Sequence, residues 1–439
     1  MELLSAWILR MVASGWVSLL DYLAAHVLLC LVPAFFIAGA LTALIPKEAV
    51  TKYLGPKAPK YISYPAAAAG GFVLAVCSCT ILPLFAGIWK RGAGLGPAIT
   101  FLFVGPAVNI LAIAYTGAAI GMDIAIARIV LSITFGIAIG LLMAVAFREG
   151  EAVADGALFA GEGRVRPAVW AFFLLLVALL IAGTLQVDLL TRTYVSWILP
   201  VDFPPGFLEA LAQAGLNLQG AVLVGLLVLI AGTAALGLNR ILERANAWTW
   251  ASLVLVVITL LVAAPRMETT ASLQVDLTGR AIAVALLLLG TVATARWGLH
   301  QEEVTHWLWE TWRFVKQIFP LLVVGVFGAG IFKAIIPASW IQTLAGRNTV
   351  WANLIGVLFG VFMYFPTLVE VPIARMFLDL GMHRGPLLAY LLADPELSLQ
   401  SILVTSRILG RTRTAVYVSL VAAFSTLAGY LFGLALAAL

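Results

Sequence analysis

Two cysteines spaced two residues apart, Cys77 and Cys79, are the residues whose type and spacing most clearly suggest chemistry. They lie in the apolar stretch VLAVCSCTILPLF, shortly before Pro83. In a regular helix residues i and i+2 do not face each other, whereas in an extended segment they point the same way. We therefore expect an unwound chain before Pro83, with both thiols placed to bind a soft metalloid cargo rather than a structural metal. The alternative is that these cysteines act as small buried hydrophobes.

Three carboxylates form a second set of candidates, in the apolar stretches PTLVEVP and DPELS. They are Glu370, Asp394 and Glu396. A carboxylate at membrane depth is costly and usually faces a cavity or another polar group, so it is a functional candidate. We expect these side chains to carry a coupling ion. The alternative for Asp394 and Glu396 is a loop just outside the membrane.

The composition determines what must position these groups. The chain of 439 residues is 63% hydrophobic and 11% charged, and its mean hydropathy is +1.06. Soluble domains carry about 25% charged residues, so we expect the lipid bilayer to be the solvent. The net charge of +5 is ordinary for such a protein, and we expect no nucleic-acid partner. The predicted fold is an all-α polytopic protein of the cytoplasmic membrane, with lipid and a small-molecule or metalloid substrate as partners and no cofactor.

About twelve transmembrane segments (ten to twelve) are predicted, because a helix of about 20 apolar residues spans the hydrocarbon layer. Their approximate limits are 22–45, 64–89, 95–120, 122–147, 167–186, 216–237, 248–265, 280–297, 317–337, 351–377, 386–409 and 412–438.

Several segments contain helix breakers. A proline in a helix removes a backbone hydrogen bond, and in lipid the freed group needs protein or water as a partner. Breaks therefore point towards a site. The substrate-contact candidates there are Cys77, Ser78, Cys79, Pro83, Pro106, Asn109 and Ser398.

Other polar residues are expected to be less important. Arg128, Lys333 and His26 lie near segment ends, where side chains of this kind reach to the interface.

The breakers repeat along the chain. A shift of 289 residues places Pro83 on Pro372 and Pro106 on Pro395. We expect two repeated four-helix units with broken helices, 1–147 and 317–439, around a central insert, 148–316, with about four segments and an amphipathic, tryptophan-rich linker at 296–317. Such repeats are the signature of a secondary transporter. Whether the repeats are parallel or inverted depends on how many insert segments span, and both remain open.

The CSC…P block, the following GPAVN (105–109) and GPLLAYLLADPELSLQSILVTSRILG (385–410) resemble the ArsP/YraQ-type family of predicted permeases. The similarity covers about residues 20–147 and 317–438. Members of its ArsP branch export trivalent organoarsenicals, and membrane-embedded cysteines are implicated in that export. The resemblance implies this role for Cys77 and Cys79, and an efflux function in arsenic resistance.

Three functions are weighed. The first is an ion-coupled permease exporting a small soft solute such as a trivalent organoarsenical; the chain has no GxxxxGK[ST] loop for a nucleotide. The second is the same architecture moving a sulfur oxyanion. The third is an intramembrane thiol oxidoreductase, which the CxC spacing disfavours. We therefore do not expect an enzyme.

Overall fold

The structure is a computed structural model that describes residues 2–24, 27–44, 47–74, 78–108, 110–147, 166–185, 187–201, 206–213, 216–242, 245–269, 273–335, 338–362 and 367–438. It consists almost entirely of helices, which confirms the predicted all-α polytopic class. The chain divides into two compact units. The first contains residues 1–16, 47–161 and 318–439, and the second contains residues 17–46 and 162–317. The predicted boundaries at residues 147 and 316 stay a prediction.

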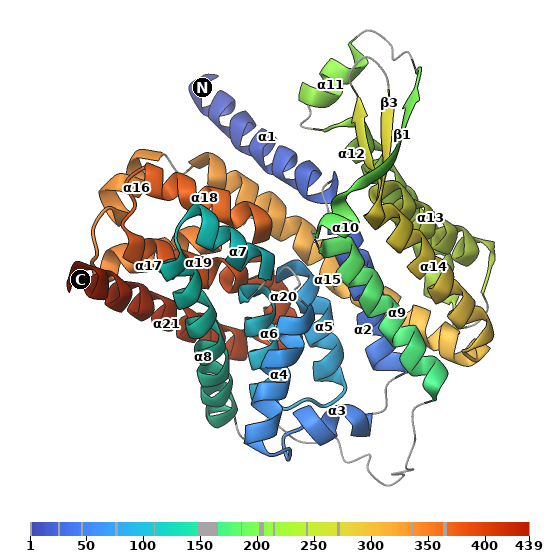
Figure 1. Ribbon diagram of the computed structural model, residues 1–439, viewed down its shortest axis with the longest axis horizontal. Coiled ribbons are helices and arrows are strands. Elements are labelled where there is room, and N and C mark those ends of the chain that lie inside the picture. Colours follow the sequence, from blue (N-terminus) through green and yellow to red (C-terminus); the bar gives the residue numbers. More distant parts are fainter. Residues whose placement is uncertain are drawn as a thin grey trace. The chain divides into compact units, whose positions relative to one another are not determined.

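The first unit contains two series of six helices (Figure 1). The first series is α3 (Lys47–Leu54), α4 (Lys60–Leu74), α5 (Ser78–Lys90), α6 (Leu95–Ala107), α7 (Ile110–Ala119) and α8 (Met122–Ala146). The second series is α16 (Ala338–Ala345), α17 (Val350–Phe362), α18 (Thr367–Asp379), α19 (Arg384–Leu397), α20 (Leu399–Leu409) and α21 (Arg411–Ala438). A shift of 289 residues carries α5 onto α18 at both ends, and the starts of α6, α7 and α8 onto those of α19, α20 and α21.

Helices α6 and α19 form the core of this unit, because every residue of α6 and every residue of α19 after Arg384 is buried. Helix α6 packs between α4 and α8, and α19 packs between α17 and α21 in the same way. The two series also contact each other: α5 of the first packs against α20 of the second, and α18 of the second packs against α7 of the first. The broken helices of one series therefore meet those of the other.

Close backbone crossings recur at the same spacing. A Cβ atom on Gly96 would lie 3.0 Å from the carbonyl oxygen of Gly140, and one on Gly385 would lie 2.7 Å from that of Gly429. Both pairs join the central helix of a series to its last helix. Because no side chain would fit between these backbones, glycine is required at the crossings.

The breaks follow the prolines. Pro106 and Pro395 lie close to the ends of α6 and α19, and a new helix starts within three residues of each end. The axes of α19 and α20 differ by 46° across Ser398. Proline cannot donate to the carbonyl four residues earlier, so each central helix lacks one backbone hydrogen bond at this point.

The second unit contains α2 (Val27–Ala43), α9 (Pro167–Thr184), α12 (Leu218–Gly237), α13 (Ala247–Ala263), α14 (Gly279–Trp297) and the first half of α15 (Gln301–Ile335). Trp307 packs against Phe172 and Phe36, with ring centroids 4.7 and 5.3 Å away, and donates a hydrogen bond to the Phe36 carbonyl. Most of the predicted amphipathic linker at 296–317 forms the start of α15, where Trp307 is buried, whereas Trp297 before it is exposed. Its role as a linker stays a prediction.

A three-stranded antiparallel sheet, unexpected from the sequence, belongs to the second unit. Its strands are β1 (Thr193–Leu199), β2 (Arg266–Thr269) and β3 (Leu273–Thr278), in the order β1-β3-β2. They fall in loops between the predicted segments. The remaining elements are α1 (Glu2–Ala24), the short helices α10 (Asp188–Thr191) and α11 (Phe207–Gln213), and a 3-10 turn at Leu238–Arg240.

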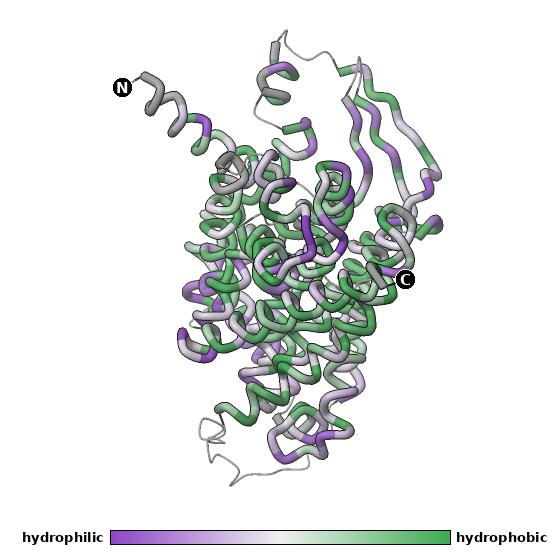
Figure 2. Tube along the Cα trace, turned by 90° about the vertical axis from the view of Figure 1, so that its left-hand side faces the viewer, coloured by the Kyte–Doolittle hydropathy of each residue, from purple (hydrophilic) through white to green (hydrophobic). Residues whose placement is uncertain are grey.

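Six described helices are long and apolar enough to cross a membrane, or seven if α19 and α20 count as one bent span. Five shorter apolar helices accompany them, α6 and α17 included. Figure 2 shows hydrophobic residues along the helices and hydrophilic ones gathered at turns and on the strands. A multi-pass membrane protein follows, while the count of twelve spans stays a prediction.

Candidate functional site

The cysteine block lies at the start of α5. Cys77 and the side chain of Cys79 lie outside the described residues. Ser78 is the first residue of α5 and is buried, and Cys79 is helical. The extended conformation expected before Pro83 is therefore wrong for residues 78 and 79. Pro83 lies inside α5, where it removes one backbone hydrogen bond without ending the helix.

An ion pair in the centre of the first unit joins the two helix series. Arg128 on α8 donates from Nη2 to Oε2 of Glu370 on α18 at 3.0 Å, and both side chains are fully buried. Arg128 also donates from Nε to the carbonyl of Ala107, at the end of broken helix α6, at 3.3 Å. The charge of Arg128 thus holds a carboxylate from one series at a helix break of the other.

Asp394 and Tyr390 of α19 lie near this pair. Both are buried, and Asp394 is close enough to interact electrostatically with Arg128 and Glu370. Several atoms of this group have no hydrogen-bond partner among the described residues: Arg128 Nη1, Glu370 Oε1, Asp394 Oδ1 and Tyr390 Oη. Buried polar atoms are normally satisfied by protein or ordered water. Unpaired donors and acceptors on three helices indicate a place where a proton, water or cargo binds.

Glu396 forms a separate buried site. Its Oε2 atom accepts a hydrogen bond of 2.7 Å from the hydroxyl of Tyr417 on α21, and its Oε1 atom has no described partner. Within the described part of the chain, the phenol of Tyr417 is the polar group that acts on Glu396, and no cationic side chain does. Tyr417 neutralises no charge, so this carboxyl is stabilised by a neutral donor alone.

The polar residues at the α19–α20 break are buried as well. Ser398 is fully buried and its hydroxyl lies 2.7 Å from that of Ser401. The amide of Gln400, also fully buried, has no partner among the described residues. Across the molecule, Pro83 and Pro106 are buried in α5 and α6.

The predicted residues thus fall into three groups. Glu370 and Asp394 come together, Glu396 lies in its own site, and Asn109 lies outside the described residues with Cys77. The loop alternative for Asp394 and Glu396 is wrong, because both lie buried inside α19.

Arg128 is the residue that sequence reasoning misjudged. It was expected to reach to the membrane interface, but it is fully buried and paired. A position seven residues into an apolar helix resembles a segment end, and its partner Glu370 lies 242 residues away. The role of Arg128 could have been inferred from Glu370, because a buried carboxylate needs a compensating cation.

Residues 13–159 and 208–434 match the ArsP_1 family, described as "Predicted permease". The chain belongs to this family of predicted permeases. It is also 35% identical over 424 residues to the UPF0718 protein MJ0584 of Methanocaldococcus jannaschii, covering 95% of each chain. No solved structure matches the chain. The family places the buried charges in a membrane transporter.

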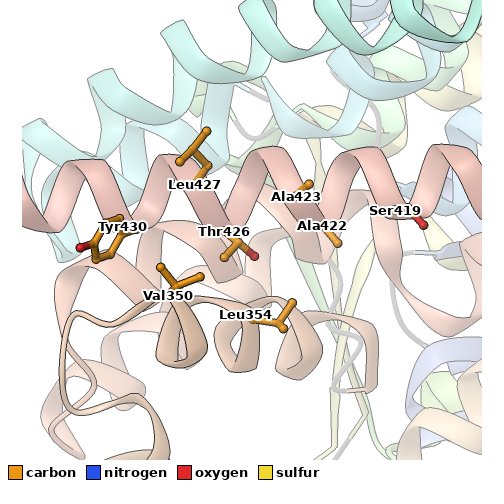
Figure 3. A pocket seen from close by; sticks show the side chains of 8 residues that line it. All are labelled: Val350, Leu354, Ser419, Ala422, Ala423, Thr426, Leu427 and Tyr430. Carbon is orange, nitrogen blue, oxygen red and sulfur yellow. The ribbon is translucent and has the colours of Figure 1, made fainter.

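The permease also has an apolar groove between α17 and α21, of about 410 Å³ (Figure 3). It is lined by Val350, Leu354, Ser419, Ala422, Ala423, Thr426, Leu427 and Tyr430. None of the candidate residues lines it. Its walls offer few polar atoms to orient a polar ligand, so the charged cluster remains the candidate site.

Proposed function

We propose that this permease is a secondary-active exporter of a small soft solute such as a trivalent organoarsenical, coupled to an ion gradient across the cytoplasmic membrane. The observation that supports coupling is the fully buried Arg128–Glu370 pair with Asp394 beside it. Ionisable groups inside a membrane protein typically mark ion or proton pathways. Here they lie where the two helix series meet.

We further infer that α3–α8 and α16–α21 are copies of one structural unit. Matching helix starts, matching glycine crossings and the packing of α5 and α18 against the other series support this. In transporters built from repeats, the site lies between the repeats and alternating access moves one against the other. The Arg128–Glu370 pair would then span the moving interface.

The soft cargo rests on the two cysteines and on the family. Thiolates favour soft metal and metalloid partners. Cys77 directly precedes α5 and Cys79 lies in its first turn, and α5 packs against α20. We propose that they contact the cargo, together with Ser78, Asn109 and Ser398 at the breaks.

One observation favours a second cargo class. Nη1 of Arg128 has no hydrogen-bond partner among the described residues, and a buried guanidinium is suited to binding an oxyanion. A sulfur oxyanion is therefore the second candidate. It would require protonation of the nearby carboxylates, which otherwise repel an anion.

The test is accumulation of trivalent methylarsenite in everted vesicles, with and without a proton gradient. We expect gradient-driven uptake that falls to the level of empty vesicles in Cys77→Ser/Cys79→Ser. Cys30→Ser, which alters the third cysteine, is the matched control and should retain uptake. Absence of methylarsenite uptake by the folded protein would exclude the arsenical. Gradient-dependent thiosulfate uptake that Arg128→Gln abolishes would then favour the oxyanion.

A further inference from the structure

The charges of the central cluster do not balance. Arg128 contributes one positive charge, whereas Glu370 and Asp394 contribute two negative charges when both are ionised. All three side chains are almost completely buried. An uncompensated charge at such a depth is very costly, and the group takes up a proton instead. The cluster is one cation short.

The hydrogen bonds show which carboxylate is compensated. Glu370 accepts a charge-assisted bond from Arg128 at 3.0 Å, and such bonds are about twice as strong as neutral ones. Asp394 has no described hydrogen bond to Arg128, and its Oδ1 atom has no described partner. The ionised form is thus stabilised at Glu370 and not at Asp394.

Other ionisable groups around α19 do not supply the missing charge. Helices α6 and α17 carry none. On α8 and α18, Asp123 pairs with Arg384, and Arg375 pairs with Asp379 at the surface. The remaining groups on α19, α20 and α21 are the phenol of Tyr390, the Glu396–Tyr417 pair, Tyr430 at the groove, and Arg407, Arg411 and Arg413 near helix ends. Arg128 and Glu370 are the charges that act on Asp394 from neighbouring helices.

We infer that Arg128, Glu370 and Asp394 form one proton-binding unit, in which Asp394 binds a single proton and Arg128 is the positioning residue that keeps Glu370 ionised. Proton binding brings the unit to zero net charge, and proton release leaves it with one negative charge. The inference deepens the proposed ion coupling by giving it one proton per cycle at this unit. Arg128 determines that number because its removal would leave two carboxylates without compensation.

The charge balance makes a separate expectation for each variant. Asp394→Asn removes the proton-binding group. Glu370→Gln frees Arg128 to pair with Asp394, which then ionises. Arg128→Gln leaves two carboxylates that each take a proton. In Arg128→Gln/Glu370→Gln, Asp394 again stands alone and binds one.

The experiment is infrared absorption by the C=O stretch of protonated carboxyl groups in the purified full-length protein at neutral pH, with no cargo present. Every variant carries Glu396→Gln, which removes the carboxyl of the Glu396–Tyr417 site. Glu310, which is also buried but paired with Arg313 at 2.7 Å, is common to all variants and does not affect the differences. Relative to the Glu396→Gln parent, Asp394→Asn and Glu370→Gln should each lose the band of one carboxyl group. Arg128→Gln should gain one, and Arg128→Gln/Glu370→Gln should match the parent.

Several results would overturn the inference. A band unchanged in Glu370→Gln would show that Arg128 does not choose between the carboxylates. Loss of the band in Arg128→Gln/Glu370→Gln would likewise show that Arg128 does not determine which carboxylate is ionised. This double variant keeps the test valid if Arg128→Gln alone does not fold. A band that disappears when sodium chloride replaces choline chloride would identify a sodium site. Because no cargo is used, failure of the arsenical assay leaves this test intact, and the reverse also holds.

Discussion

Arg128 on α8 and Tyr417 on α21 lie 289 residues apart, and so do their partners Ala107 and Glu396. Arg128 donates to the Ala107 carbonyl at the end of α6, and Tyr417 donates to the Glu396 carboxylate near the end of α19. The contact between α6 and α8, here called the first crossing, therefore joins a cation to a backbone carbonyl. The equivalent contact between α19 and α21, the second crossing, joins a phenol to a carboxyl group. The same helix geometry can hold a charge that is compensated or an acid that is only hydrogen-bonded.

The two crossings differ in whether they connect the two helix series. At the first, Arg128 reaches across to Glu370 of the other series, so its charge depends on contact between the series. At the second, Glu396 and Tyr417 belong to one series. Movement of one series against the other would break the first interaction and leave the second intact.

The largest expected effect comes from the first crossing. Arg128→Met leaves Glu370 buried without its cation, and loss of one partner from a buried pair costs roughly 3–5 kcal/mol. Denaturant unfolding of the purified protein in detergent would measure this. Arg128→Met/Glu370→Leu, with both charges replaced by apolar groups, should recover most of the loss. A single variant as stable as the wild type would refute the difference between the crossings.

A smaller effect is expected at the second crossing. Tyr417→Phe removes the hydrogen bond to Glu396 and leaves a buried acceptor without a partner, which costs roughly 1–3 kcal/mol. The same unfolding measurement applies, with Tyr430→Phe at the apolar groove of the same helix as the control. If Tyr417→Phe cost more than Arg128→Met, the hydrogen-bonded acid would be the stronger of the two contacts.

The smallest expected effect concerns a hydrogen-bonded acid outside the predicted membrane segments, which can be compared with the buried Glu396. Asp276 on β3 is partly exposed, and hydrogen bonds from Gln274 and Ser196 hold its pKa below the ordinary value of 3.8. A lowered pKa in the folded state stabilises the protein above pH 3.8, and this contribution is lost as the pH falls through the folded-state pKa. Asp276→Asn should therefore lower the melting temperature slightly at neutral pH and not at the acid end. An equal shift at all pH values would contradict this.

The sequence predicted the framework well because its signals are local. Apolar runs predict helices in lipid, and Pro106 and Pro395 mark breaks that the structure has within a few residues. The strands escaped prediction because β1 and β3 are short, and paired residues lie 74 or more positions apart in the sequence.

The candidate site was predicted only in part, for a physical reason. Glu370 and Asp394 could be recognised because a carboxylate in an apolar run has few alternatives. The roles of Arg128 and Tyr417 depend on partners supplied by folding, 242 and 21 residues away. Tyr417 sits in an amphiphilic stretch where a tyrosine is unremarkable, so no local pattern separates it from a residue facing lipid.

The glycine crossings have a mechanical consequence. At Gly96–Gly140 and at Gly385–Gly429, the backbones approach closely, and neither glycine of a pair contributes a side chain that could rotate. The helices α4, α6 and α8 should therefore move together as one rigid body, and α17, α19 and α21 as another. Relative motion should occur where only side chains connect the two bodies. The fully buried contact between a guanidinium and a carboxylate is one such joint, and how often it opens would set the upper limit on how fast the permease can turn over.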